Sequence, residues 1–405
     1  MVAGMPGLKI VALERSVRFR WPTILAGMLA GSLFCAACED ATGPDLDEAR
    51  FIVVLDGWPE TGLTHRLGAF GMDSGELIEW SPPVMFRIAR VAVSPPDSLM
   101  FVTGTGPAGW TESQIAVVDW NTLETVDRRF FADENGYRRE TFGGLAVSPT
   151  GPVTLAPDGR RLFIGDARNE TGEWGIAVLG AHSLEAEGFI GPFADRDFLL
   201  STIPDGEYRQ GGAIVATIPD TTWPHAATKV VVVDPGSLAI VDTLQVSTDG
   251  DGIVEMVPGP HGRHLYVRTG AGRLSRYDLT LGATTTTATV THARGRLAVV
   301  PDGSRLYYVQ RWTHDWSSPA VISVYDSDLT ELPPIDLSGM TEPPALNMAA
   351  VRADGTLIVA AGAIGPQLWG QQPGRILMVD PETGRVVKET SLDGEVAVGK
   401  VILLR

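Results

Sequence analysis

Tryptophan recurs along this chain in a pattern that predicts a binding surface. Seven of the ten Trp residues stand in short Gly-, Pro- and Thr-rich segments between apolar runs: Trp58, Trp110, Trp174, Trp223, Trp312, Trp316 and Trp369. An indole ring can stack on a sugar ring, an aromatic ligand or a peptide. These residues therefore predict a ligand site, provided that the fold brings their segments together.

The same Trp residues support a second hypothesis, in which each indole packs as a lid over the neighbouring repeat unit. One Trp can bury about 150 to 250 Å² of surface, and a packing solution shared by all repeats would also place one Trp in each repeat.

The nearby segments carry acidic residues that would attract cations or polar groups if the Trp surface binds a ligand: Asp133, Glu134, Asp195, Asp197, Asp249, Asp251 and Asp393.

Metal-binding signals are weak. Residues 248–252, TDGDG, offer the oxygen ligands that calcium prefers, but they lack the spacing and terminal Glu of an EF-hand, which favours a Gly turn. His65, His225 and His314 could meet around a metal only if distant segments converge, and solvated loop histidines are the alternative. We predict no metal and no cofactor.

Two nucleotide-binding patterns occur, and both stand in the wrong context. Residues 104–109 fit G-x-G-x-x-G, but a strand is expected next, where a helix N-terminus should hold the pyrophosphate. Residues 394–400 have P-loop spacing, yet Val401 replaces the Ser or Thr that binds magnesium. There is also no G-x-S-x-G nucleophile elbow, so no catalytic residue is assigned.

The elements that must position these residues are β-strands. From Phe51 onward, short runs rich in Val, Ile, Leu and Tyr are bounded by Gly, Pro, Asp and Asn, and no long 3.6-residue periodicity is present. This pattern predicts an all-β chain.

The strands repeat seven times. An apolar run that ends in Asp recurs at intervals of 44 to 61 residues, and Gly180 replaces the Asp in the third copy: Asp73, Asp119, Gly180, Asp234, Asp278, Asp326 and Asp380. The Asp is expected to accept hydrogen bonds from backbone N–H groups two residues on. The 355 residues from 51 to 405, divided by seven, give about 51 per repeat, somewhat above the roughly 40 to 50 of a four-stranded propeller blade.

A second motif marks the turn between the first two strands of each repeat. Residues 157–163, 260–266 and 301–307 share the pattern P-[DH]-G-x-x-L-[FY]. Ser148-Pro149 also resembles this motif in the second repeat, but the spacing favours the turn at Pro157. Gly at the third position permits the positive φ of such a turn.

These paired motifs resemble the YVTN repeat of seven-bladed β-propellers, the group that includes YncE-like proteins. Leu265-Tyr-Val267 and Leu306-Tyr-Tyr-Val309 carry the likeness most clearly, and it covers residues 51–405. The resemblance implies seven four-stranded antiparallel blades in a ring and says almost nothing about function, because propellers host unrelated activities. Single-strand DNA binding is known in this group, but the acidic charge of this chain argues against it.

The two ends of the propeller region are expected to share one blade. Residues 395–405 match an inner strand with no blade after it, and residues 51–79 match the three outer strands with no inner strand before them. Their pairing would close the ring and remove its open edges. In such a ring the P-D-G and Asp turns occupy one face, the turn face, and the Trp-containing loops occupy the other, the loop face.

The N-terminus has the features of an export signal. Four basic residues precede an apolar run at residues 24–37, which at 14 residues is too short for the roughly 20 that span a bilayer. The run ends in Phe34-Cys-Ala-Ala-Cys38, which resembles the lipobox of bacterial lipoproteins, although Cys35 stands where Leu is usual. We therefore predict a signal peptide at 1–37, lipidation of Cys38, an acidic tether at 38–50 and a propeller at 51–405, with a plain secretory signal as the alternative.

Charge limits the partners. Removal of residues 1–37, with four basic and one acidic side chain, changes the formal net charge from −17 to −20. Nucleic acid, which needs clustered Lys and Arg, is disfavoured. We predict a monomeric, lipid-anchored envelope protein that binds a small molecule, glycan or protein through its loop face. The alternative is an envelope hydrolase of the lactonase-like or quinoprotein-like propeller type.

Overall fold

The computed structural model describes residues 50–56, 65–85, 87–106, 109–130, 146–147, 151–194, 199–218, 229–246, 252–290, 295–310, 320–341, 344, 346–362, 374–392 and 397–403. All of them belong to one compact unit, Leu46–Arg405. In this described part the regular elements are β-strands, with 3₁₀ turns at η2 (Pro95–Asp97) and η4 (Pro260–Gly262). None of these residues forms a helix of the length and apolar character needed to cross a membrane.

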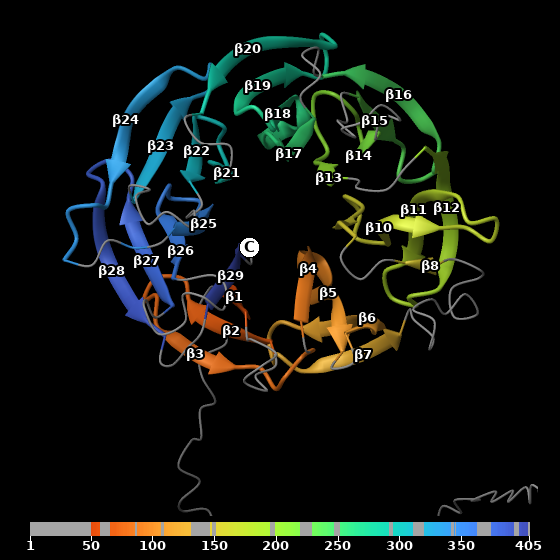
Figure 1. Cartoon of the computed structure of the whole chain (residues 1–405), viewed down its shortest axis with the longest axis horizontal. Helices are drawn as coiled ribbons and strands as arrows, with labels where there is room; N and C mark the ends of the chain where they lie inside the picture. The colour runs from red at the N-terminus through yellow and green to blue at the C-terminus, as the bar shows by residue number, and fades with distance from the viewer. Residues whose placement is uncertain are drawn as a thin grey trace, which may run out of the picture. The chain divides into compact units, whose positions relative to one another are not determined.

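The strands form seven antiparallel sheets, or blades, arranged in a ring around a central opening (Figure 1). Blade 1 contains β4 (Arg87–Ser94), β5 (Leu99–Gly106), β6 (Gly109–Asp119) and β7 (Thr125–Phe130). Blade 2 contains β8 (Ala146–Val147), β9 (Val153–Leu155), β10 (Arg161–Arg168), β11 (Trp174–Gly180) and β12 (Ala186–Phe193). Its inner strand is divided, because β8 and β9 both pair with β10.

The next four blades each run in sequence order from the centre outward. Blade 3 contains β13 (Leu200–Ile203), β14 (Ala213–Ile218), β15 (Lys229–Val233) and β16 (Ile240–Gln245). Blade 4 contains β17 (Ile253–Pro258), β18 (His264–Thr269), β19 (Arg273–Asp278) and β20 (Ala283–Thr289). Blade 5 contains β21 (Gly295–Val299), β22 (Arg305–Gln310), β23 (Val321–Asp326) and β24 (Glu331–Asp336), and blade 6 contains β25 (Leu346–Val351), β26 (Leu357–Ala361), β27 (Arg375–Asp380) and β28 (Arg385–Ser391).

Blade 7 joins the two ends of the ring, as predicted. Its sheet has the order β29 (Ala397–Leu403), β1 (Arg50–Asp56), β2 (Arg66–Gly71) and β3 (Leu77–Trp80). β29 and β1 pair antiparallel, with Phe51 opposite Leu403 and Asp56 opposite Ala397. The seven-bladed all-β prediction is therefore confirmed, and the predicted third-strand end at Asp73 is corrected to Gly71.

Burial explains why the middle strands are apolar runs rather than alternating ones. Four consecutive valines, residues 230–233 of β15, are all buried, because neighbouring blades cover both faces of the sheet. The outer strand β20 of blade 4 is instead mostly exposed and rich in Thr. The core therefore consists of layers between blades.

Both predicted turn motifs are present. The Asp at the end of the third strand accepts an N–H bond from two residues on in five blades, at 2.7 to 3.0 Å: Asp119, Asp234, Asp278, Asp326 and Asp380. In the P-D-G turns, Gly159 and Gly303 both have φ of 75°. The turn of blade 2 lies between β9 and β10, as the spacing predicted.

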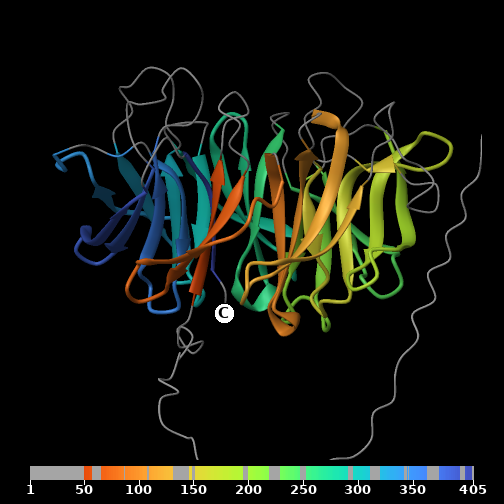
Figure 2. The ribbon, with the colours of Figure 1, turned by 90° about the horizontal axis from the view of Figure 1, so that it is seen from below.

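The turn face holds the blades together through polar contacts at every blade junction. Each contact joins a basic side chain to an acidic side chain or a backbone carbonyl oxygen of the adjacent blade: His182–Asp97 (3.9 Å), Arg161–Pro235 O (2.6 Å), Arg263–Glu207 (3.4 Å), Arg276–Asp328 (2.9 Å), Arg305–Glu382 (3.0 Å), Arg352–Asp73 (2.5 Å) and Arg50–Asn121 O (3.1 Å). These contacts support the structural role predicted for this face, which is the lower one in Figure 2.

Candidate functional site in the central channel and on the loop face

Most of the predicted Trp site lies outside the described residues. This holds for Trp58, Trp223, Trp312, Trp316 and Trp369, and also for Cys38. Trp110 is placed in β6, near the loop-face end of blade 1, and its side chain is not described. The hypothesis of a shared Trp surface therefore stays a prediction.

Trp174 is the predicted site residue whose side chain is described. It begins β11, after a hairpin in which the Asn169 side-chain oxygen accepts the N–H groups of Thr171 (3.1 Å) and Glu173 (2.9 Å). The guanidinium carbon of Arg168 lies 3.8 Å from the centroid of the indole ring, and the Trp is only partly buried. A cation–π contact of this kind covers one face of the ring, so Trp174 packs against its own blade. The lid hypothesis, which places the indole over the neighbouring blade, stays a prediction.

His65 is buried and does not present a free nitrogen to a metal site on the loop face. Its Nδ1 atom accepts the backbone N–H of Ile88 at 2.8 Å, and its backbone N–H bonds to the carbonyl oxygen of Met85 at 2.9 Å. It therefore joins blade 7 to blade 1. His225 and His314 lie outside the described residues.

The two nucleotide-like patterns lie in strands. Gly104 belongs to β5, which continues to Gly106, and Lys400 belongs to β29. Neither residue begins a helix, which agrees with the prediction that both matches arise by chance. Of the 248–252 segment, only Gly252 is described. In the described part of the chain, no three His, Cys, Asp or Glu side chains gather closely enough to hold a metal.

The structure assembles a different set of residues around the channel. In each blade, one second-strand residue stands four places beyond the residue opposite the end of the third strand. In five blades it pairs with an inner-strand residue, and in blades 2 and 3 its backbone N–H bonds to the carbonyl oxygen of the residue just before the inner strand. These equivalent residues, one per blade, form the channel ring: Arg90, Pro152, Leu199, Glu255, Arg296, Met348 and Lys400. The ring lies in the loop-face half of the inner strands, because these strands begin at the loop face.

Glu255 links blade 4 to blade 5 in the wall of this ring. Its Oε2 atom accepts Nε–H of Arg268 at 3.2 Å, and its Oε1 atom accepts the backbone N–H of Leu297 at 3.1 Å. Arg296 Nη1 lies 3.8 Å from Oε1. Burial raises the pKa of this carboxyl group, and the two guanidinium groups oppose that shift.

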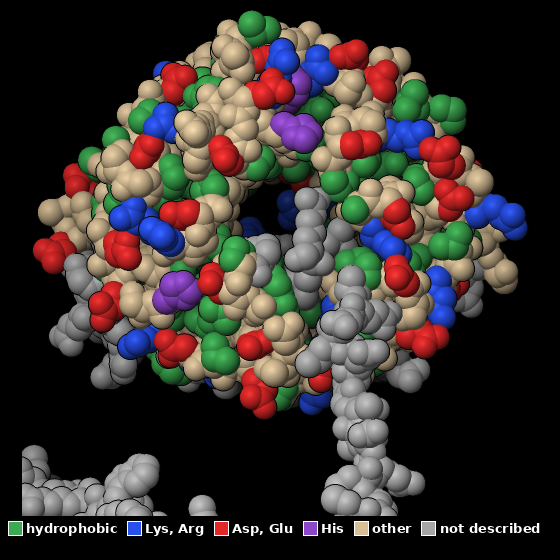
Figure 3. Space-filling model, turned by 180° about the vertical axis from the view of Figure 1, so that it is seen from behind, with side chains coloured by type: hydrophobic (Ala, Val, Ile, Leu, Met, Phe, Trp, Pro, Cys, Tyr) green, Lys and Arg blue, Asp and Glu red, His purple; other side chains and the backbone are tan. Residues whose placement is uncertain are grey.

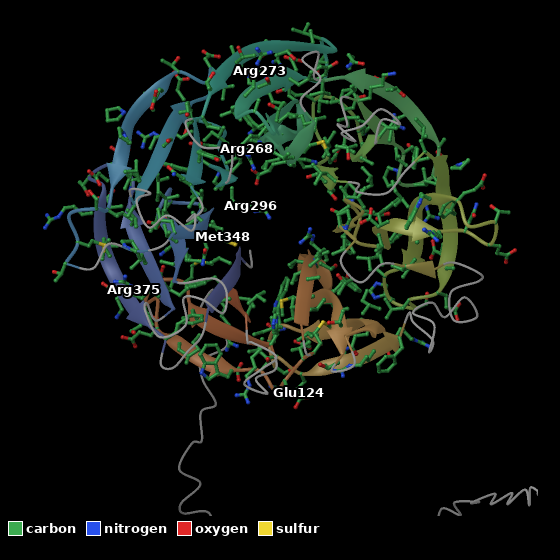
Figure 4. The ribbon with its side chains drawn as sticks, viewed as in Figure 1. Glu124, Arg268, Arg273, Arg296, Met348 and Arg375 are labelled. Carbon is green, nitrogen blue, oxygen red and sulfur yellow. The ribbon has the colours of Figure 1, made fainter. Side chains whose placement is uncertain are left out.

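Arg268 completes the link from the second strand of blade 4. Its side chain is only 5% exposed, and its Nη2 donates to the carbonyl oxygen of Gly295 at 3.1 Å. The guanidinium carbon lies 5.6 Å from the ring centroid of the buried Tyr308. Figure 4 shows Arg268 along the inner wall and Arg296 extending into the central opening.

Arg90 occupies the channel-ring position of blade 1 and is exposed. Its pKa is lowered first by desolvation within the channel and then by the like charge of Arg296, and the carboxylate of Asp166 opposes the shift. Blades 1 and 5 are not neighbours, so these two guanidinium groups can influence each other only across the channel. Lys and Arg side chains are visible in the depth of the central opening from the turn face (Figure 3).

Sequence reasoning missed this cluster. Blade 4, which carries Glu255 and Arg268, is the blade whose second-to-third loop has no Trp. One signal was present, because Glu255 and Arg296 are charged residues within otherwise apolar inner strands. Their shared level, however, depends on the register of each inner strand against the second strand of its blade.

Comparison with known proteins supports the fold alone. No protein-family profile matches the sequence, and no curated protein matches it. Many solved structures are similar, among them a dihydro-heme d1 dehydrogenase, NirN, in complex with DHE. That match has a TM-score of 0.53 and 13% sequence identity, and it covers 88% of this chain and 75% of that chain.

Proposed function

We propose that this protein is an exported, lipid-anchored β-propeller of the YVTN-repeat, YncE-like type that acts as a binding module in the bacterial cell envelope. The observation that carries the proposal is the central channel, in whose wall Arg90 and Arg296 are exposed to solvent. Irregular loops on a rigid scaffold are where proteins usually bind. The sequence predicts that the Trp-containing connections belong to the loop face.

The direction of the chain supports the proposed anchor. Arg50 begins β1 opposite Gly71, beside the turn that leads into β3, so the propeller is entered at the turn face. A lipid on Cys38 followed by a short tether would attach the molecule through that face. The loop face would then be available to ligands on the opposite side.

Glu255 is poorly suited to general-base catalysis, because both of its oxygens accept hydrogen bonds from the protein. The NirN neighbour is named a dehydrogenase, but at 13% identity the likeness extends to architecture alone. Binding is therefore the function that we carry forward.

The binding proposal is tested by a ligand screen on the purified full chain. Glycans, lactones and small organic acids are titrated while Trp emission and thermal unfolding are recorded together. We expect one class to quench the emission, and Trp312→Ala or Trp316→Ala to remove the quenching without lowering Tm. Loss of stability in these variants with no ligand effect from any class would instead establish the lid role.

The anchor is tested separately with two cysteine variants three residues apart. We expect Cys38→Ala to abolish incorporation of a radiolabelled fatty acid and to release the protein from membranes. Cys35→Ala should retain both properties. Equal labelling of the wild type and Cys38→Ala would contradict lipidation at this residue.

A further inference from the structure

The channel ring contains two guanidinium groups on non-adjacent blades, at equivalent register positions of strands that border the central opening from different sides (Figure 1). Arg90 extends from β4, and Arg296 extends from β21. Both are exposed to the solvent of the channel, and the Arg296 side chain is 47% exposed. Two like charges held together in a partly desolvated passage raise the free energy of the folded protein.

Neither group is held as a structural Arg is held in this protein. Arg268 shows the contrast, because it is buried against Glu255, Gly295 and Tyr308. Arg90 donates to the carbonyl oxygen of the adjacent Ala89 at 3.1 Å, and Arg296 meets only one edge of Glu255, at 3.8 Å. Each guanidinium group carries five N–H donors, so both retain donor capacity directed at the channel.

The charges near the channel ring favour an anion even though the whole protein is acidic. Among the described side chains that interact electrostatically here, three guanidinium groups, Arg90, Arg268 and Arg296, stand against two carboxyl groups, Glu255 and Asp166. With a formal net charge of −17, the long-range field repels anions, so an anion that binds here must be held by directed short-range hydrogen bonds.

We propose that the channel ring binds an oxyanion with two negative charges, such as a dicarboxylate or a phosphate group, held between Arg90 and Arg296. The planar fork of Arg matches carboxylate and phosphate oxygens, and a doubly charged ligand satisfies both guanidinium groups at once. A chloride ion would also accept hydrogen bonds from the two guanidinium groups, but it has no pair of oxygen atoms to match the planar fork of each Arg. The inference rests on the proposed binding function and specifies its ligand class.

The test measures anion binding to the full chain by calorimetry, with sodium succinate and sodium phosphate as separate probes and sodium chloride at matched ionic strength. The variants are Arg90→Gln and Arg296→Gln, and the control is Arg273→Gln, which removes the same charge from the start of β19, away from the channel (Figure 4). We expect each channel variant to weaken binding at least about tenfold and Arg273→Gln to leave it unchanged. Thermal unfolding without added anion confirms that all three variants fold.

The two probes and the control separate the possible outcomes. Binding of succinate or of phosphate that depends on Arg90 and Arg296 supports the proposal and identifies the kind of oxyanion. Equal weakening by Arg273→Gln, or no binding of either probe beyond chloride, overturns it. If a neutral glycan quenches Trp emission while neither anion binds, the anion site fails and the binding function stands. Arg-dependent anion binding without any Trp response supports the anion site and contradicts a Trp ligand surface.

Discussion

At the scale of single residues, two side-chain types fix the geometry of the turns and of the inner strands. Asp at the end of a third strand caps the following turn, and Gly allows close approach where an aromatic ring lies against an inner strand. Both roles follow from local chemistry, and each can be removed by one substitution.

Asp234 should make a pH-dependent contribution to stability. The N–H of Ser237 and the guanidinium group of Arg209 hydrogen-bond its carboxylate and lower its pKa to about 2 from the ordinary 3.8. Because the folded-state pKa lies below the unfolded one, the stabilisation is present above about pH 4 and is lost as the pH falls toward 2.

We therefore expect Asp234→Asn to lower the free energy of unfolding by about 1 to 2 kcal/mol at pH 7. Urea unfolding of both proteins at pH 7, 5 and 3 measures the difference. It should be constant between pH 7 and 5 and smaller at pH 3. A difference that does not change down to pH 3 would contradict this account.

Gly295 should not tolerate even a methyl group. A Cβ atom there would lie 2.3 Å from Cζ and 2.5 Å from the hydroxyl oxygen of Tyr308, whose side chain is fully buried and cannot move aside. We expect Gly295→Ala to cost about 1 to 3 kcal/mol of stability in chemical denaturation. Gly339→Ala is the control, because a Cβ atom there meets nothing within 4 Å; equal effects of the two variants would refute the steric argument.

At the scale of elements, the blades are separate sheets that must be joined side by side. Apolar layers between the blades provide most of the adhesion, and they are non-directional. The polar contacts of the turn face fix the position of each blade relative to the next, because each contact joins a defined atom of one blade to a turn of the adjacent blade. Arg352 shows how such a contact works.

Arg352 should matter more than its acidic partner. It donates to the carbonyl oxygen of Met72 at 2.7 Å and to the carboxylate of Asp73 at 2.5 Å, but the Asp73 side chain is 81% exposed. We expect Arg352→Ala to lower the unfolding free energy by about 1 to 2 kcal/mol and Asp73→Ala by less than about 0.5 kcal/mol. Arg385→Ala, at an exposed position in β28, should have no effect, and an Asp73→Ala cost as large as that of Arg352→Ala would show that the ion pair dominates.

At the scale of the whole molecule, stability depends on closure of the ring. β29 supplies the inner strand of the blade whose other strands come from the start of the propeller. Without it, β1 becomes an open edge, and buried residues such as Phe51 and Val53 lose their cover.

Removal of residues 395–405 should therefore open or unfold the ring rather than trim a tail. We expect Tm to fall by at least about 10 °C, or cooperative unfolding to disappear, in calorimetry. A chain that ends at Leu403 keeps all of β29 and should match the wild type. If the longer truncation also matched the wild type, closure by β29 would be wrong.

The sequence alone determined the architecture, because the architecture follows from short sequence motifs that recur in each blade. The Asp and P-D-G turns, the apolar runs between them and the mismatched ends predicted seven blades and a shared closing blade. Each signal acts over a few residues, so spacing was sufficient to find it. Trp174 shows the limit of such signals, since its type indicated a surface but the contact with Arg168 was needed to show how it packs.

Only the tertiary structure decided what lines the channel. Arg90 and Arg296 are about 200 residues apart in the sequence, and they share a level because the register of each inner strand against its second strand places them there. Charge in an inner strand reveals nothing about its partner, because electrostatic interaction depends on distance through space. The channel ring is therefore a property of the closed propeller, whereas the turns that build the propeller are properties of the chain.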